Sequence, residues 1–94
     1  MSASFEWDEK KNQVNLRKHK IDFEDAISIF ESFIYEEVDN RKDYGEIRII
    51  AFGECNKQVL CIVYTKRKKA RRIISARKAS SYETKEYYKK KFEK

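Results

Sequence analysis

Residues 59–64 read VLCIVY, an unbroken run of β-branched, aromatic and other apolar side chains. A strand with one wet face alternates apolar and polar residues, whereas a continuous apolar run indicates a strand covered on both faces. A turn-like stretch, residues 53–57, precedes this run, and a basic turn, residues 66–70, follows it. We therefore predict a central strand over residues 59–64 and assign the other elements around it.

Further strands are predicted on both sides of the central one. Two precede it, Ile34 to Val38 and Ile47 to Phe52, and a last one, Arg71 to Arg77, follows it. A short extended segment, Phe5 to Trp7, begins the chain. Because strands joined in sequence by short turns pair in opposite directions, we expect an antiparallel sheet.

Three helices are predicted from their capping residues. Asp8 suits the N-cap of a short, largely exposed helix over residues 9–19. Asp22 opens a second helix, and Ser80 caps a C-terminal helix with Glu83 at the capping-box position. The second helix carries one apolar stripe at helical spacing, made of Phe23, Ala26, Ile27 and Phe30. The element order β-α-α-β-β-β-β-α predicts an α+β fold with helices packed on the sheet.

The length and composition bound the class of protein. With 94 residues, the chain suits one domain over residues 1–94. No run of 18 apolar residues occurs, so we expect no membrane span. Cys55 and Cys61 predict two free thiols, and with one histidine they make a poor zinc set, so we expect no metal and no cofactor. These features favour a cytoplasmic protein.

The charge is strongly polarised along the chain. Residues 1–40 carry 5 basic and 10 acidic side chains, whereas residues 41–94 carry 17 basic and 6 acidic ones. The stretch from Asp22 to Asp39 holds seven acids and no base, and Lys66 to Lys78 holds eight bases and no acid. Such a run of bases favours an anionic partner over an ordinary solvated surface.

The first helix groups several candidate binding residues. Lys11, Asn15 and Lys18 fall at i, i+4 and i+7 and therefore share one face, with His19 beside them at the helix end. The spacing allows contact with a polyanion but does not by itself favour it, because helix ends of this kind are common. The alternative is a solvated helix face that ends in a histidine interacting with the helix dipole.

The last two strands supply candidate phosphate ligands: Arg67, Arg71, Arg72 and Arg77. Strict alternation would place Arg71 and Arg77 on one face of the sheet and Arg72 on the other. A guanidinium fork matches phosphate oxygens and is always charged. The alternative for Arg77 is a structural ion pair with Glu83 or Glu86, because an unpaired buried charge is costly.

Aromatic and basic residues near these strands complete the candidate set. Tyr82, Tyr87 and Tyr88 lie close to the basic region, and Lys66 and Lys78 bound it. Aromatics interleaved with bases suit unstacked RNA bases. The alternative is packing of the terminal helix on the core, for which Tyr88 is the strongest candidate.

Several motifs follow one another in a specific order and spacing over most of the chain. They are Phe5-Glu6-Trp7-Asp8 followed by Lys11, Asn15, Lys18 and His19; Phe23-Glu24-Asp25-Ala26; Asp43-Tyr44-Gly45-Glu46 with Arg48; Tyr64-Thr65-Lys66-Arg67; Arg72-Ile73-Ile74-Ser75-Ala76-Arg77-Lys78-Ala79; and Glu83 with Tyr87. Together these motifs resemble the BrnT family of toxins. Two positions differ from that family: Lys20 stands where it has glycine, a position suited to a left-handed helix stop, and Thr84 replaces its arginine.

The resemblance implies a RelE-like fold and an endoribonuclease that inhibits translation, and our hypothesis is that it cuts RNA without a metal ion. It also implies neutralisation by a BrnA-type DNA-binding antitoxin, so that promoter DNA is reached only through the complex. Under this hypothesis His19, or Lys18 in its place, is the general base, since histidine ordinarily titrates near neutral pH. Arg67 and Arg77 would stabilise the phosphorane charge, and Tyr87 would stack a base or assist the leaving group. The predicted RNA-binding residues are Lys11, Asn15, Lys66, Arg71, Arg72 and Lys78.

Two other classes of function remain open from the sequence. A non-catalytic nucleic-acid-binding module needs the same basic patch and no proton-transfer group. A protein-interaction subunit would use the acidic stretch Asp22 to Asp39 and the basic strands only to dock a partner.

Overall fold

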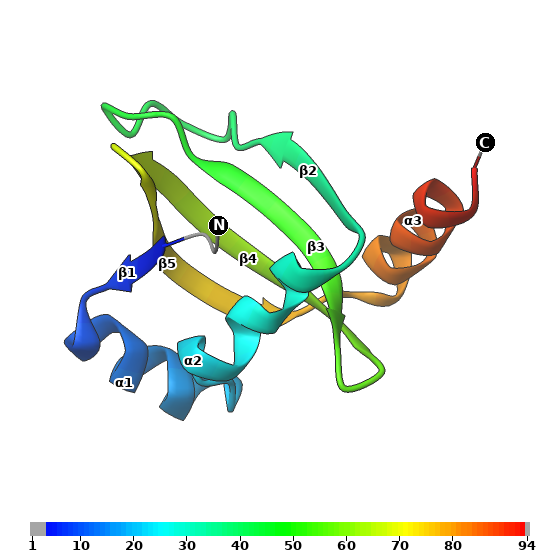
Figure 1. Ribbon diagram of the computed structural model, residues 1–94, viewed down its shortest axis with the longest axis horizontal. Coiled ribbons are helices and arrows are strands. Elements are labelled where there is room, and N and C mark those ends of the chain that lie inside the picture. Colours follow the sequence, from blue (N-terminus) through cyan, green and yellow to red (C-terminus); the bar gives the residue numbers. More distant parts are fainter. Residues whose placement is uncertain (1–3, 94) are drawn as a thin grey trace.

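The computed structural model describes residues 4–93, so the ends of the predicted domain, residues 1–3 and 94, lie outside it. Within the described part, five strands and three α-helices follow the predicted α+β order (Figure 1). The elements are β1 (Ser4–Trp7), α1 (Glu9–His19), α2 (Phe23–Ala26), the 3₁₀ helix η1 (Ile27–Glu31), β2 (Ile34–Val38), β3 (Ile49–Cys55), β4 (Gln58–Arg67), β5 (Ala70–Lys78) and α3 (Ser81–Phe92).

One sheet contains all five strands in the order β1-β5-β4-β3-β2. Strands β2 to β5 pair antiparallel as predicted, whereas β1 joins the outer side of β5 in parallel. Short turns force neighbouring strands to run in opposite directions. No such turn constrains β1, because the chain leaves it through α1, α2 and η1 before it enters β2 at the opposite edge.

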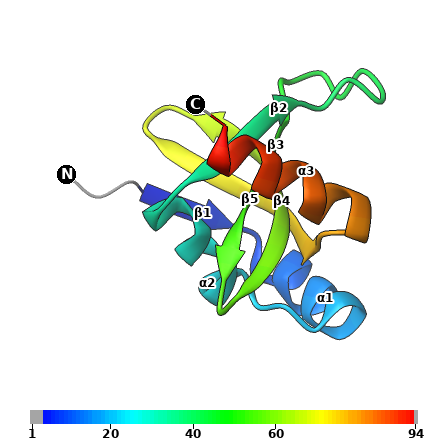
Figure 2. The ribbon, with the colours of Figure 1, turned by 90° about the vertical axis from the view of Figure 1, so that its right-hand side faces the viewer.

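The sheet lies between helices on its two faces (Figure 1, Figure 2). On the face covered by α2 and η1, which we call the N-helix face, β4 contributes Leu60, Ile62 and Tyr64 to the larger buried cluster. On the face covered by α3, the α3 face, β4 contributes Val59 and Cys61 to a smaller cluster. Strand β4 is therefore the central strand predicted from its apolar run.

The predicted helix caps are confirmed. Asp8 accepts a hydrogen bond from the Lys10 amide at 2.9 Å, and Asp22 accepts one from the Glu24 amide at 3.0 Å. At α3 the Ser80 hydroxyl accepts from the Glu83 amide at 3.1 Å, while the Glu83 carboxylate accepts from the Ser80 amide at 2.8 Å.

The second predicted helix is shorter than its apolar stripe suggested. After one α-helical turn the chain tightens into η1. A 3₁₀ helix has three residues per turn, so Phe23, Ala26 and Ile29 come to lie on one face. All three are fully buried against the sheet, and Ile27 and Phe30 are only partly buried.

A β-bulge in β5 changes which residues share a face. Val63 lies opposite Ser75 and Tyr64 opposite Ile73, so Ile74 has no partner on β4. Because the extra residue shifts the alternation by one, Ile73 and Ala76 both face the N-helix side. The prediction that Arg71 and Arg77 share a face is therefore wrong.

The cysteines are free thiols, as predicted, and Cys61 is buried. Burial raises the pKa of the Cys61 thiol to about 11. No helix within residues 4–93 combines the length and the apolar character that a bilayer crossing requires.

Candidate active site

A hollow of about 340 Å³ opens between α1 and the edge of β5, and we call it the α1–β5 hollow. Val14 and Ile74 give it apolar walls, and the side chains of Lys10, Lys11 and Lys18 that line it carry positive charge. None of its lining residues carries a carboxylate. The lining is Lys10, Lys11, Val14, Asn15, Lys18, His19, Ile74 and Ser75. The structure thus brings together the four candidates on the first helix.

Asn15 attaches α1 to the sheet. Its Nδ2 donates to the carbonyls of Ala76 at 2.8 Å and Ile21 at 3.0 Å, and its Oδ1 accepts from the Ala76 amide at 3.1 Å. The side chain therefore pairs with the β5 backbone as a neighbouring strand would, just beyond the end of β1. The predicted RNA contact of Asn15 is corrected to a structural role, because the residue is buried and its amide is already engaged.

Asn12 makes a similar attachment between α1 and the start of α2. Its Oδ1 accepts from the Phe23 amide at 2.9 Å and its Nδ2 donates to Asp22 at 3.1 Å. Helix α1 is largely exposed, as predicted, and its two buried residues are the asparagines Asn12 and Asn15. Sequence reasoning missed Asn12. The available signal was two asparagines at i and i+3 inside a helix, a residue type that favours caps and turns over helix interiors.

His19 is the last residue of α1 and is half-buried at the hollow. The helix ends because Lys20 adopts the left-handed conformation, with φ 62°, and donates its amide to the Leu16 carbonyl at 2.8 Å. The helix stop predicted for this position is confirmed, although a lysine occupies it instead of glycine.

Each arginine on the α3 face of the last two strands has a carboxylate partner. Arg77 makes two hydrogen bonds to Glu83, at 2.8 and 2.9 Å. This fork and the Ser80 amide lower the pKa of Glu83 to about 2. Arg72 pairs with Glu6 at 2.9 Å, and Arg67 lies 3.6 Å from Glu46. The ion-pair alternative considered for Arg77 is therefore the observed arrangement.

The arginines do not form one phosphate pocket. Arg77 lies opposite Cys61, six residues before Arg67 on β4. At about 3.3 Å per residue this separates Arg67 from Arg77 by roughly 20 Å. Arg71 points to the other face, where its guanidinium lies over the ring of Phe30. The predicted joint action of Arg67 and Arg77 on one phosphate is corrected on this ground.

The tyrosines of α3 are also assigned differently by the structure. Tyr87 is fully buried and its hydroxyl donates to the Phe33 carbonyl at 2.9 Å. It cannot stack an RNA base in this arrangement, so its predicted catalytic role is corrected to core packing. Tyr88, the predicted core residue, is half-buried and donates to Glu54 at 2.7 Å. Tyr82 is the exposed member of the three, with 72% of its surface accessible.

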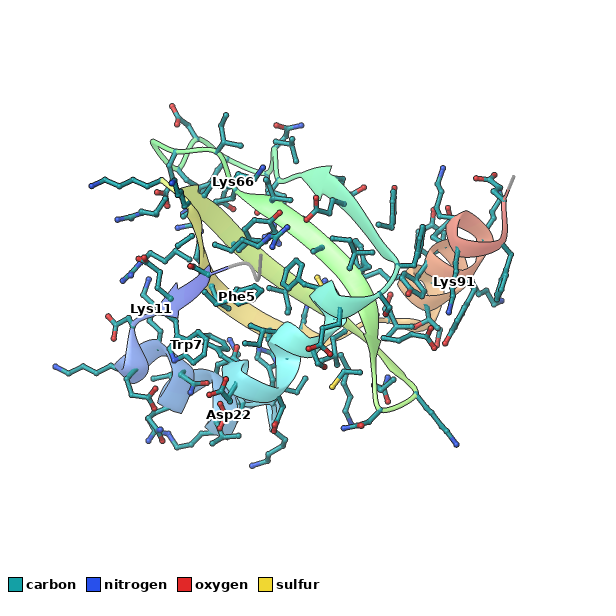
Figure 3. The ribbon with its side chains drawn as sticks, in the orientation of Figure 1. Phe5, Trp7, Lys11, Asp22, Lys66 and Lys91 are labelled. Atoms are coloured by element: carbon teal, nitrogen blue, oxygen red, sulfur yellow. The ribbon has the colours of Figure 1, made fainter. Side chains whose placement is uncertain are left out.

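The predicted RNA-binding lysines lie on separate surfaces. Figure 3 shows Lys11 on α1 and Lys66 near the far end of β4, well apart in the molecule. Lys78 is exposed at the opposite end of β5 from the β4–β5 turn. The hollow therefore holds Lys11 and Lys18, whereas Lys66 belongs to a second basic surface.

Comparisons with known proteins agree with this fold. A family model described as the ribonuclease toxin BrnT of type II toxin–antitoxin systems matches residues 7–83. The crystal structure of the Brucella abortus ribonuclease toxin BrnT superimposes with a TM-score of 0.65 and 31% sequence identity, covering 85% of this chain and 100% of that one. No curated protein matches. The family match over residues 7–83 and the shared fold show that this chain belongs to the BrnT family of type II toxin–antitoxin ribonuclease toxins.

Proposed function

We propose that this protein is a metal-independent endoribonuclease that cleaves RNA at the α1–β5 hollow and thereby stops translation in the cytoplasm. One observation carries the proposal: His19 and three lysines line a hollow whose lining includes no carboxylate. A phosphodiester entering it meets positive charge without a competing anion. The apolar side chains of Val14 and Ile74 offer a surface for a base.

The chemistry would be an internal transesterification. His19 accepts the proton of the ribose 2′-hydroxyl, and the 2′-oxygen forms a bond to phosphorus while the bond to the 5′-oxygen breaks. Lys11 and Lys18 stabilise the charge that builds on the phosphate oxygens, and the ammonium of Lys18 gives a proton to the leaving 5′-oxygen. The products are a 2′,3′-cyclic phosphate and a 5′-hydroxyl end.

Purified protein and a labelled RNA test this proposal. We expect cleavage that persists in EDTA and products that end in a cyclic phosphate. His19→Ala should slow cleavage by about 10²- to 10⁴-fold, as expected for loss of a general base. The matched control is Lys89→Ala on α3, which removes an exposed charge away from the hollow. Loss of cleavage in EDTA, or full activity of His19→Ala, would contradict the proposal.

Two alternatives are separated by the same assay. A non-catalytic nucleic-acid-binding module would bind RNA in a salt-sensitive way and yield no product. A protein-interaction subunit would neither bind nor cleave RNA, and its expression alone would not slow growth.

Membership of a type II toxin–antitoxin family supports an antitoxin partner for this chain. We propose a BrnA-type, DNA-binding antitoxin, with promoter DNA contacted through the complex only. Co-expression with the product of the adjacent reading frame should restore growth. Unrelieved toxicity would refute that pairing.

A further inference from the structure

The tip of the β4–β5 hairpin carries positive charge that the α1–β5 hollow does not include. Strand β4 ends at Arg67 and β5 begins at Ala70, so a two-residue turn joins them. A pocket of about 240 Å³ opens there, and none of its lining residues is acidic. We call this surface the hairpin tip, and its residues are Lys66, Lys68, Lys69, Ala70 and Arg71.

Arg71 is fixed in place by aromatic rings. Its guanidinium carbon lies 4.5 Å from the ring centre of Phe30, 5.5 Å from that of Tyr64 and 5.8 Å from that of Phe5. Aromatic faces attract a cation through their quadrupole. The three rings therefore hold the guanidinium in one place, so little side-chain freedom remains to be lost when an anion binds.

Arg71 differs from the other arginines of β4 and β5, whose charges are each paired with a carboxylate. Over residues 4–93, Arg67, Arg72 and Arg77 each have a carboxylate within 4 Å and Arg71 has none. Its Nε is buried without a hydrogen-bond partner. Tyr64, one of the three rings around the guanidinium, donates its hydroxyl to Glu36 at 2.5 Å. The positive charge of the half-buried Arg71 therefore adds to that of the three lysines of the hairpin tip, and together they attract a phosphate.

We propose that the hairpin tip is a second RNA-binding site, which holds phosphate groups of the nucleotides that flank the cleaved bond. The proposal rests on the ribonuclease function proposed above. From Ala70 at the tip to Ile74 at the hollow, β5 advances four residues, roughly 13 Å. One single strand of several nucleotides reaches both surfaces. Its phosphates also relieve the mutual repulsion of the three lysines and Arg71.

Binding of a strand that resists cleavage tests the proposal separately from catalysis. The probes are fluorescent 2′-O-methyl oligouridines of 12 and 3 nucleotides, whose blocked 2′-oxygen prevents transesterification, measured by anisotropy across a salt series. The test variant is Lys68→Gln/Lys69→Gln. The control is Lys57→Gln/Lys89→Gln, which removes the same charge from exposed sites elsewhere, and Lys57 has a positive φ like that of Lys68.

We expect the tip variant to lose two phosphate contacts to the 12-nucleotide strand. The slope of log affinity against log salt should fall by about 1.4, which corresponds to about 25-fold weaker binding at 0.1 M salt when the affinities are equal at 1 M. The tip variant should bind the 3-nucleotide strand with near wild-type affinity. The control variant should bind both strands with near wild-type affinity.

Equal weakening in the test variant and the control would show that only net charge matters and would overturn the proposal. So would normal RNA binding by the tip variant together with a weakened antitoxin complex, since the tip would then be a protein contact. If the tip binds RNA as expected and the wild type cleaves none, the hairpin tip stands as an RNA-binding surface, but the ribonuclease function fails and with it the role of the tip in holding a cleaved strand. If the wild type cleaves RNA and the tip variant binds it normally, the ribonuclease function stands and the second RNA-binding site fails.

Discussion

Replacing Asn15 tests the idea that one buried amide holds the candidate site together. Its side chain makes three hydrogen bonds, two as donor to the Ala76 and Ile21 carbonyls and one as acceptor from the Ala76 amide. In Asn15→Ala all three are lost, and three backbone groups in a buried place lose their partners. At about 1 kcal/mol for each net hydrogen bond, the free energy of unfolding should fall by about 3 kcal/mol.

Urea unfolding followed by circular dichroism measures this loss. With a denaturant slope of about 1.5 kcal/mol per molar, the midpoint should fall by roughly 2 M. The matched control is Gln13→Ala on the same helix, which removes one exposed bond to Glu9 and should cost about 0.5 kcal/mol or less. Both variants lose one amide side chain from α1, so the comparison isolates the attachment to β5.

Asn15→Asp sharpens the test, because it keeps the shape of the side chain. The acceptor for the Ala76 amide remains, but an oxygen replaces the group that donates to two carbonyls. At neutral pH we expect a loss at least as large as that of the alanine variant, since an ionised carboxylate then faces carbonyl oxygens in a buried site. Acidification should recover part of it, because a protonated carboxyl can donate once. A loss below about 1 kcal/mol in Asn15→Ala, or equal to that of Gln13→Ala, would refute the role of Asn15; failure to fold would support it.

Three further predictions follow from single contacts. Glu83 has a folded-state pKa of about 2, below its ordinary value of 4.5, so its contribution is present above about pH 5 and is lost as the pH falls toward 2. Glu83→Gln should flatten the acid limb of a stability-versus-pH curve and cost about 1–2 kcal/mol at pH 7, allowing for the partly exposed Arg77; an unchanged acid limb would contradict this. Lys20→Gly should stabilise the fold by about 0.5–1 kcal/mol, because Lys20 has φ 62°, and calorimetry should show a raised Tm; a lowered Tm would exclude that reason. Tyr87→Phe should cost about 1 kcal/mol through its bond to Phe33 yet leave RNA cleavage unchanged, whereas a cleavage rate reduced tenfold would restore a catalytic role for Tyr87.

The candidate site was only partly predictable. Lys11, Lys18 and His19 were found from helical spacing, because positions on one helix face follow from local geometry alone. That β5 forms the other wall of their hollow is a contact between residues about 60 positions apart, which helical spacing cannot show. The buried Asn15 was assigned to the correct face, but the β5 backbone that it binds could not be foreseen.

The arginines show why the other predictions about the site were wrong. Strict alternation assumed an unbroken strand, and the bulge at Ile74 placed Arg71 and Arg77 on opposite faces. The carboxylate partner of Arg72 comes from β1, which is distant in sequence and pairs with β5 only in the tertiary structure, and that of Arg67 comes from the loop before β3. Tyr87 and Tyr88 are adjacent on α3, and the docking angle of that helix decided which of them is buried.

Local sequence patterns were enough to predict the element order, the central strand, the helix caps and the α+β class, because apolar runs and capping residues act within a few positions of the chain. The parallel placement of β1, the bulge in β5 and the partner of each arginine became visible in the folded molecule and not before. These features depend on which segments, distant in sequence, come into contact, and on which carboxylates then pair with the arginines. Neither is encoded in the spacing of neighbouring residues.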